Sequence, residues 1–199
     1  MLKKVNILIT CSSGKFTFDV VKALKSLNNF KIKIIGVDSS PKTNLAYLDK
    51  QYKISKCSNS KNYLKELFKI CKREKIKIIF PLSELETILY SKNLSLFAKK
   101  KIKVLISNHH IVSNIVDKIS MFKYLEKRGI DVGEWEVINN KIDMLKYIKK
   151  LGYPKKKIVL KQRKGSGSRG IIILDNKLKK FKYLLENRFC GTGNLISVI

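Results

Sequence analysis

The chain has 199 residues, and 43 Lys and Arg against 15 Asp and Glu give it a formal net charge of +28. Apolar residues make up 44% of the chain, which excludes a wholly disordered protein. No apolar run approaches the roughly 18 residues of a membrane-spanning helix. The apolar stretch Val5–Ile9 is shorter than the ~7–15 residues of a secretion leader. It is interpreted as a first strand, and the protein as cytoplasmic and without a membrane partner.

The four cysteines form no CxxC pair, and no histidine stands at metal-ligand spacing from them. His109-His110 has no HExxH partner. The sequence therefore predicts neither a disulfide scaffold nor a metal site within this chain.

The positive charge is carried mostly by lysine, because only five of the 43 basic residues are arginine. Proteins that read nucleic-acid bases favour arginine for its bidentate fork. The lysines are spread over every segment, which indicates a solvated surface and argues against a nucleic-acid partner. Polyanion binding stays open as an alternative, and a bound nucleotide would still be attracted by this charge.

Strand and helix patterns alternate over about the first 110 residues. Such alternation is typical of an α/β protein with a parallel sheet and crossover helices. Strands are predicted at Val5–Thr10, Lys33–Val37, Tyr52–Ser55, Lys77–Phe80 and Lys103–Ile106, with helices at Phe18–Leu27, Asn62–Lys75 and Glu84–Lys99.

Ligands of such sheets bind beyond the carboxyl ends of the strands. Three segments should therefore share one rim: Cys11–Lys15, Asp38–Ser40 and Pro81–Glu86. Asp38 is expected to face the same rim as Gly14 and Pro81, although an Asp before Ser39-Ser40-Pro41 is also typical of a turn.

The pattern changes after about residue 107. The expected elements are a helix Ile115–Lys127 closed by Gly129, a strand Trp135–Ile138, a helix Lys141–Lys150, strands Lys157–Gln162 and Gly170–Leu174, a helix Leu178–Asn187, and a last strand within Asn194–Ile199.

A glycine-rich segment, Gly165–Gly170, matches GxGxxG, but it is followed by Ile171–Leu174, which is typical of a strand. The motif is therefore interpreted as a strand–loop–strand hairpin and not as a dinucleotide-binding turn. A loop with few Cβ atoms can offer backbone N–H groups to phosphate oxygens. Lys161 ends the apolar run Ile158–Leu160, and a buried charge there needs an anionic partner such as phosphate.

With these motifs in order, the sequence resembles the ATP-grasp superfamily, in the branch of carbamoyl phosphate synthase large chains and related carboxylate–amine ligases. The segments that carry the resemblance are Ile7–Thr10 with Gly14, Gly36–Asp38, Pro81–Glu86, Asp117-Lys118, Gly152–Pro154, and Val159–Lys161 before Lys164–Gly170. The resemblance implies a Rossmann-like pre-ATP-grasp domain at residues 1–112. It also implies the first, incomplete α+β subdomain of an ATP-grasp fold at residues 113–199.

The same resemblance implies site residues. Lys118 and Lys161 would contact the ATP phosphates, and the loop would close over them with Lys164, Gly165, Ser166, Gly167, Ser168, Arg169 and Gly170. On the substrate side the candidates are Gly14, Asp38, Glu84 and Glu86. For the two glutamates the ordinary alternative is an acid favoured by the dipole at a helix start.

The implied chemistry joins a carboxylate to an amine through an acyl-phosphate, with ATP and Mg²⁺ as cofactors. The family's metal ligands are Glu and Asn residues, and Cys190–Ile199 hold one Asn and no acid. The chain is therefore expected to be the amino-terminal piece of a longer enzyme, inactive alone, with its magnesium ligands in the missing carboxyl-terminal part. Leu195–Ile199 is expected to form an uncovered strand edge, which predicts self-association or a complementing carboxyl-terminal chain. The alternative function is a non-enzymatic, degenerate ATP-grasp module or a polyanion-binding protein.

Overall fold

The computed structural model describes residues 2–41, 46–165, 170–175 and 195–198. The chain divides into two compact units, Met1–Val112 and Ser113–Ile199. The predicted helix Leu178–Asn187 lies outside the described residues.

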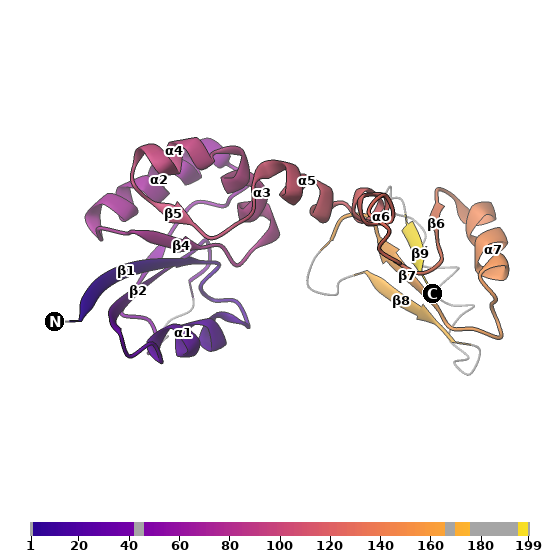
Figure 1. Ribbon diagram of the computed structural model, residues 1–199, viewed down its shortest axis with the longest axis horizontal. Helices are drawn as coiled ribbons and strands as arrows, with labels where there is room; N and C mark the ends of the chain where they lie inside the picture. The colour runs from indigo at the N-terminus through magenta and orange to yellow at the C-terminus, as the bar shows by residue number, and fades with distance from the viewer. Residues whose placement is uncertain (1, 42–45, 166–169, 176–194, 199) are drawn as a thin grey trace. The chain divides into compact units, whose positions relative to one another are not determined.

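The first unit is built on a five-stranded parallel sheet in the order β3-β2-β1-β4-β5 (Figure 1). This confirms the five predicted strands and their parallel pairing. The strands are β1 (Lys3–Thr10), β2 (Phe30–Asp38), β3 (Lys50–Lys53), β4 (Ile78–Phe80) and β5 (Lys103–Val104), and the helices between them are α1 (Thr17–Lys25), α2 (Ser60–Arg73), α3 (Glu84–Lys92) and α4 (Leu94–Lys99).

Alternate side chains of the sheet enter two separate cores, because successive strand residues point to opposite faces. Leu8 packs with Tyr63 of α2 and Phe97 of α4. Ile7 and Ile9 pack on the other face with Val21 of α1. Helices therefore cover both faces, as Figure 1 shows, and the ends of the strands are left to carry a site.

Two helices predicted as continuous are each broken. The segment expected as Glu84–Lys99 forms α3 and α4 with a break at Asn93, whose side-chain Nδ2 donates to Leu89 O at 2.8 Å. The predicted start of the helix Ile115–Lys127 is wrong. One helix, α5 (His109–Val116), ends at Val116, and the next, α6 (Lys118–Glu126), begins after Asp117. Short polar side chains that bond to nearby backbone groups explain both breaks. Gly129 closes α6 with a φ of +70°, as predicted.

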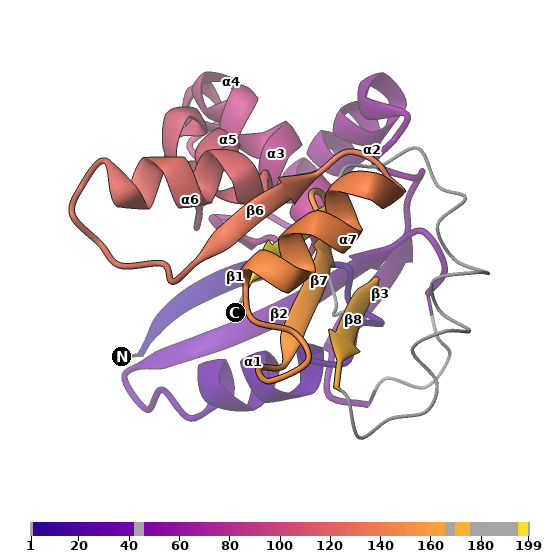
Figure 2. The same ribbon diagram turned by 90° about the vertical axis from the view of Figure 1, so that its right-hand side faces the viewer.

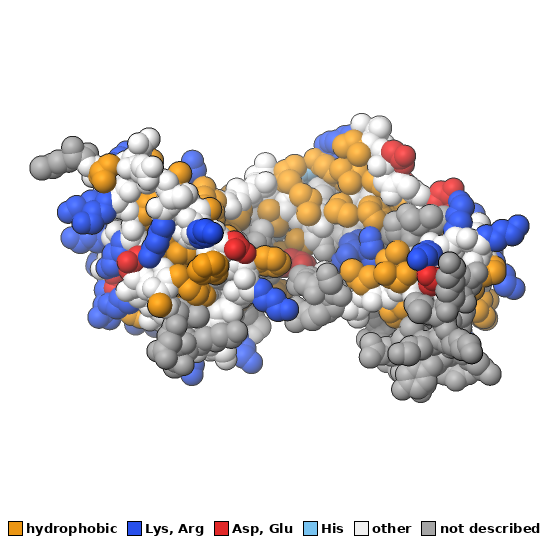
Figure 3. Space-filling view, turned by 90° about the horizontal axis from the view of Figure 1, so that it is seen from below, with side chains coloured by type: hydrophobic (Ala, Val, Ile, Leu, Met, Phe, Trp, Pro, Cys, Tyr) orange, Lys and Arg blue, Asp and Glu red, His pale blue; other side chains and the backbone are white. Residues whose placement is uncertain are grey.

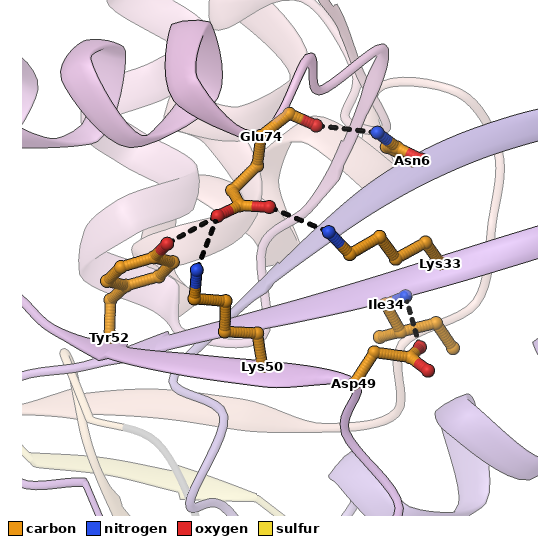
Figure 4. Close-up of polar contacts among 7 residues, drawn as sticks. All are labelled: Asn6, Lys33, Ile34, Asp49, Lys50, Tyr52 and Glu74. Atoms are coloured by element: carbon orange, nitrogen blue, oxygen red, sulfur yellow. Dashed lines mark hydrogen bonds and ion pairs between the residues drawn. The ribbon is translucent and has the colours of Figure 1, made fainter.

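A buried acid, Glu74, lies at the end of the sheet opposite to the rim that carries Asp38. The Glu74 carboxylate accepts hydrogen bonds from Lys33 Nζ at 2.9 Å and Lys50 Nζ at 3.0 Å, and from the Tyr52 hydroxyl (Figure 4). Its backbone carbonyl accepts from Asn6 Nδ2 at 2.6 Å. The Tyr52 hydroxyl and the two ammonium groups lower the pKa of Glu74 to about 2. Glu74 thus ties the end of α2 to three strands.

The second unit holds an antiparallel sheet in the order β6-β9-β7-β8. The strands are β6 (Trp135–Ile138), β7 (Ile158–Gln162), β8 (Ile171–Leu174) and β9 (Leu195–Val198), and the helix α7 spans Lys141–Lys150. Figure 2 shows α7 lying across β7, and Met144 and Ile148 pack there against Ile158 and Leu160. The strand–loop–strand hairpin expected around the glycine-rich segment is confirmed by the pairing of β7 with β8.

The last strand corrects the expectation of an uncovered edge at Leu195–Ile199. β9 pairs with β6 on one side and with β7 on the other, so it is an inner strand of the sheet. The sequence pattern showed an apolar run near the chain end but not the partners, which come from segments about 35 and 60 residues away. The self-association inferred from that edge no longer follows from it.

Candidate functional site

The start of α6 is fixed by Asp117, which makes bonds in two directions. Its Oδ1 accepts from the amides of Ile119 and Ser120 at 3.1 and 3.2 Å, which caps the helix. Its Oδ2 accepts from Arg163 Nε at 2.7 Å. Burial acts to raise the pKa of Asp117, but the Ser120 amide and the Arg163 guanidinium outweigh it, and the pKa lies below its ordinary value. Arg163 is therefore occupied in holding α6 against the end of β7.

Lys118 lies at the base of the glycine-rich loop. Its amide donates to Arg163 O at 3.2 Å, and its Nζ donates to Gly165 O at 3.1 Å. These two bonds join the first residue of α6 to the residues just after β7, and the predicted contact of Lys118 with ATP stays a prediction. The ammonium group stays exposed at this contact.

Lys161 lies near the end of β7, on the face of the sheet that α7 does not cover. Its neighbours Ile158 and Leu160 face the α7 core, so strand alternation places Lys161 with Val159 on the opposite face. The cross-strand partners on that face are Ile171 and Ile173, whose side chains are 43% and 54% exposed. This face therefore offers an aliphatic surface with one lysine at its end.

Lys161 is half-buried, and its ammonium group makes no hydrogen bond or ion pair with any residue that the structure describes. A cation in that position is free to take an anionic ligand. Lys164, three residues further along the chain, is exposed. Within the loop, Ser166, Gly167, Ser168 and Arg169 lie outside the described residues, so their predicted contacts with ATP stay predictions.

Gly170 explains part of the glycine pattern. Its φ of +72° is a conformation that other residues adopt only with strain, and a Cβ there would lie 2.5 Å from Gln162 Cδ. Glycine at this position lets the chain turn back into β8.

In the first unit, Asp38 lies at the end of β2 beside the loop that follows β1. Its Oδ2 accepts from Ser13 N at 3.0 Å, and its Oδ1 accepts from Ser40 N at 2.9 Å. Asp38 thus contacts the loop that contains Gly14. It also forms the turn with Ser40 that is the alternative interpretation of an Asp at this position. Gly14 N donates to Cys11 O at 2.9 Å, and this bond closes the loop after β1.

The two candidate glutamates, Glu84 and Glu86, have different surroundings in the structure. Glu86 is only 6% exposed, and its carboxylate accepts from Thr10 Oγ1 and from Tyr63 OH, both at 2.5 Å. Glu84, the first residue of α3, is half-buried, and its carboxylate has no hydrogen bond or ion pair with the described residues. Glu84 is therefore the better placed of the two to meet a ligand. No local pattern in the sequence marks Thr10, Tyr63 or Arg163, since their partners are remote in the chain.

The described residues contain no group of three or more His, Cys, Asp or Glu that could hold a metal ion. None of the helices in the described part of the chain combines the length and the apolar character needed to cross a bilayer. Figure 3 shows Lys and Arg side chains spread over the face in view and not gathered in one patch, in line with the solvated surface inferred from the sequence.

Residues 7–105 match the family model described as "PylC-like, N-terminal domain". No curated relative matches the sequence. Among solved structures, a carboxyaminoimidazole ribonucleotide synthase from Aspergillus clavatus, complexed with ATP, has a TM-score of 0.64 at 17% identity, over 98% of this chain and 47% of that one. Biotin carboxylase from Campylobacter jejuni has a TM-score of 0.60 at 20% identity, over 98% and 45%.

An L-amino acid ligase from Bacillus licheniformis has a TM-score of 0.62 at 13% identity, over 99% of this chain and 44% of that one. The chain thus spans about half the length of the structures it matches. These findings confirm the resemblance inferred from the motifs: the chain has the fold of the N-terminal portion of ATP-grasp enzymes, and its residues 7–105 match the PylC-like N-terminal domain.

Proposed function

We propose that the chain is the ATP-binding portion of an ATP-grasp ligase, which joins a carboxylate to an amine through an acyl-phosphate. The observation that carries the proposal is the bond from Lys118 Nζ to Gly165 O, 3.1 Å long, at the base of the β7–β8 hairpin. It brings a second cation to the hairpin on which Lys161 lies without a partner among the described residues. Two lysines can neutralise part of the charge of a triphosphate, and a glycine-rich sequence can offer backbone N–H groups to its oxygens.

The sheet face beside Lys161 supports the same proposal. Val159, Ile171 and Ile173 form an aliphatic surface that could pack against a nucleotide base, while Lys161 meets the phosphates. Lys118 would exchange its carbonyl partner for a phosphate oxygen, which is a stronger, charge-assisted acceptor.

Magnesium accompanies ATP in this proposal, but the described residues here fit phosphate and not the metal. Mg²⁺ prefers carboxylate and water oxygens. The nearby carboxylate, Asp117, is already engaged by Arg163 and by two helix amides. The magnesium ligands are therefore proposed to lie outside this chain, in a complementing part of the enzyme.

Residues 1–112 are proposed to form the pre-ATP-grasp domain and residues 113–199 the first part of the ATP-grasp domain. On the first of these, Gly14, Asp38 and Glu84 are the proposed substrate-side residues at the rim. Cys11, Cys57 and Cys71 are free thiols, which supports a reducing, cytoplasmic location.

Calorimetric titration of ATP in the presence of Mg²⁺ tests the proposal on the full chain. Lys161→Ala and Lys118→Ala should each weaken ATP binding by about ten- to a hundredfold, the effect of losing a charge-assisted hydrogen bond. The matched control is Lys149→Ala, which removes the same charge from an exposed position on α7. Equal affinity of all four proteins would contradict the phosphate site.

A parallel titration with RNA separates the alternative function. If RNA binds with strong salt dependence, and Lys161→Ala and Lys149→Ala weaken it equally, the positive surface and not the hairpin is the ligand site.

A further inference from the structure

A chain of buried hydroxyl groups in the first unit ends on Glu86. The Tyr90 and Tyr63 hydroxyls lie 2.6 Å apart, and Tyr63 OH lies 2.5 Å from Glu86 Oε1. On the other side, Thr10 Oγ1 lies 2.5 Å from Glu86 Oε2. This row of hydrogen bonds therefore links the last residue of β1 to residues of α2 and α3.

The positions of the protons follow from counting donors. An ionised Glu86 only accepts, so Tyr63 must donate to it and must itself accept from Tyr90. Thr10 donates to the other carboxylate oxygen and accepts from Leu82 N at 3.3 Å. With Glu86 ionised, each of these three hydroxyl protons has an acceptor.

A proton on Glu86 breaks this arrangement. If Glu86 donates to Tyr63, Tyr63 must donate to Tyr90, and the Tyr90 proton has no acceptor among the described residues. If Glu86 donates to Thr10, the Thr10 proton loses its acceptor in the same way. If Glu86 donates to Ser83, the third hydroxyl that bonds its carboxylate, the Ser83 proton loses its acceptor in turn. Thr10 and Tyr90 are fully buried, so a hydroxyl left unsatisfied at either of them favours a local rearrangement.

The surroundings of Glu86 act in the opposite direction to these bonds. The largest effect is burial, which disfavours the charged form of the carboxyl group. The hydrogen bonds from Thr10, Tyr63 and Ser83 favour the charged form, and the negative charge of Asp38 disfavours it. The balance raises the pKa of Glu86 above its ordinary value. The titratable groups that interact with it come from the loop after β1, the end of β2, the loop after β3, α2 and α3: Cys11, Asp38, Cys57, Tyr63 and Tyr90.

We propose that Glu86 is a proton-dependent latch, which when ionised ties β1, α2 and α3 together and when protonated releases the turn that opens α3. The link to that turn is Thr10, because its hydroxyl oxygen holds the Leu82 amide while its proton goes to Glu86. The released segment, Leu82–Glu86, contains Glu84, so the latch would set how firmly the start of α3 is held at the rim. The inference stands on the first unit alone and does not depend on the nucleotide site.

Hydrogen exchange by NMR on the full chain, between about pH 4 and about pH 8, tests the latch. After correction for intrinsic rates, the amides of Leu82 and Glu86 should lose about tenfold in protection on acidification. The midpoint should coincide with the titration of the Glu86 carboxyl carbon. Glu84→Gln, on the same helix, is the matched control and should leave this midpoint in place.

Glu86→Gln should abolish the pH dependence of both amides, because it removes the titrating group. Tyr63→Phe keeps the carboxyl but removes one donor that favours its charged form, so the midpoint should move upward by about half a unit or more. An unchanged midpoint in Tyr63→Phe, or the same pH dependence in Glu86→Gln, would overturn the proposal.

Discussion

Arg163 Nε lies 2.7 Å from Asp117 Oδ2, although 46 residues separate the two in the chain. This ion pair, with the bond from Lys118 N to Arg163 O, fixes the start of α6 to the segment that enters the glycine-rich loop. The position of Lys118 at that loop therefore depends on a contact that neither α6 nor β7 makes alone.

Replacing Asp117 by Ala should destabilise the second unit by about 1–3 kcal/mol, since it removes a helix cap and a charged hydrogen bond together. Urea unfolding measures the effect. Glu134→Ala, at an exposed loop position, is the control and should change stability by no more than about 0.5 kcal/mol. In a double-mutant cycle with Arg163→Ala, strictly additive effects would show that the pair contributes nothing.

Glu74 should make the first unit sensitive to acid. Its folded-state pKa of about 2 lies below the ordinary 4.5, so its contribution is present above pH 4.5 and is lost as the pH falls toward 2. Because Lys33 and Lys50 are 47% and 42% exposed, we expect only about 1–2 kcal/mol. Unfolding curves of the wild type and Glu74→Gln should converge over this interval, whereas a constant difference down to pH 2 would contradict the assignment.

Gly170→Ala should destabilise the β7–β8 hairpin by about 1–3 kcal/mol, chiefly through the positive φ of +72°. The close atom, Gln162 Cδ, belongs to an exposed, flexible side chain and can move aside. Gly170→Asn is the matched comparison, because asparagine tolerates this conformation better than alanine. Thermal unfolding should rank glycine above asparagine and asparagine above alanine, and equal melting temperatures would argue against a conformational requirement.

Ser197→Pro should unfold the second unit or cost at least about 3 kcal/mol, because proline removes a ladder hydrogen bond from an inner strand. Ser197 pairs with Glu136 on one side and with Leu160 on the other. Ser197→Ala is the control for the lost side chain. If circular dichroism showed the proline variant to be as stable as the alanine variant, β9 would not hold the inner position.

The sequence alone determined the parallel sheet of the first unit, since Val5–Thr10 and Lys33–Val37 are apolar runs of strand length separated by a helical pattern. It also determined the β7–β8 hairpin, because β-branched residues follow the glycine-rich segment directly. These features depend on local periodicity and on residues close together in the chain. The phosphate-side candidates Lys118 and Lys161 came from motif order, and their role in binding stays a prediction.

Only the tertiary structure decided which strand became an inner one, which acid was buried and what held Lys118 in place. β9 lies between β6 and β7, Glu86 is enclosed by Thr10 and Tyr63 while Glu84 is not, and Arg163 pairs with Asp117. Each of these outcomes joins groups that are remote in sequence. Their energies come from desolvation and from directional bonds that exist only once the chain has folded, so no local pattern carries them.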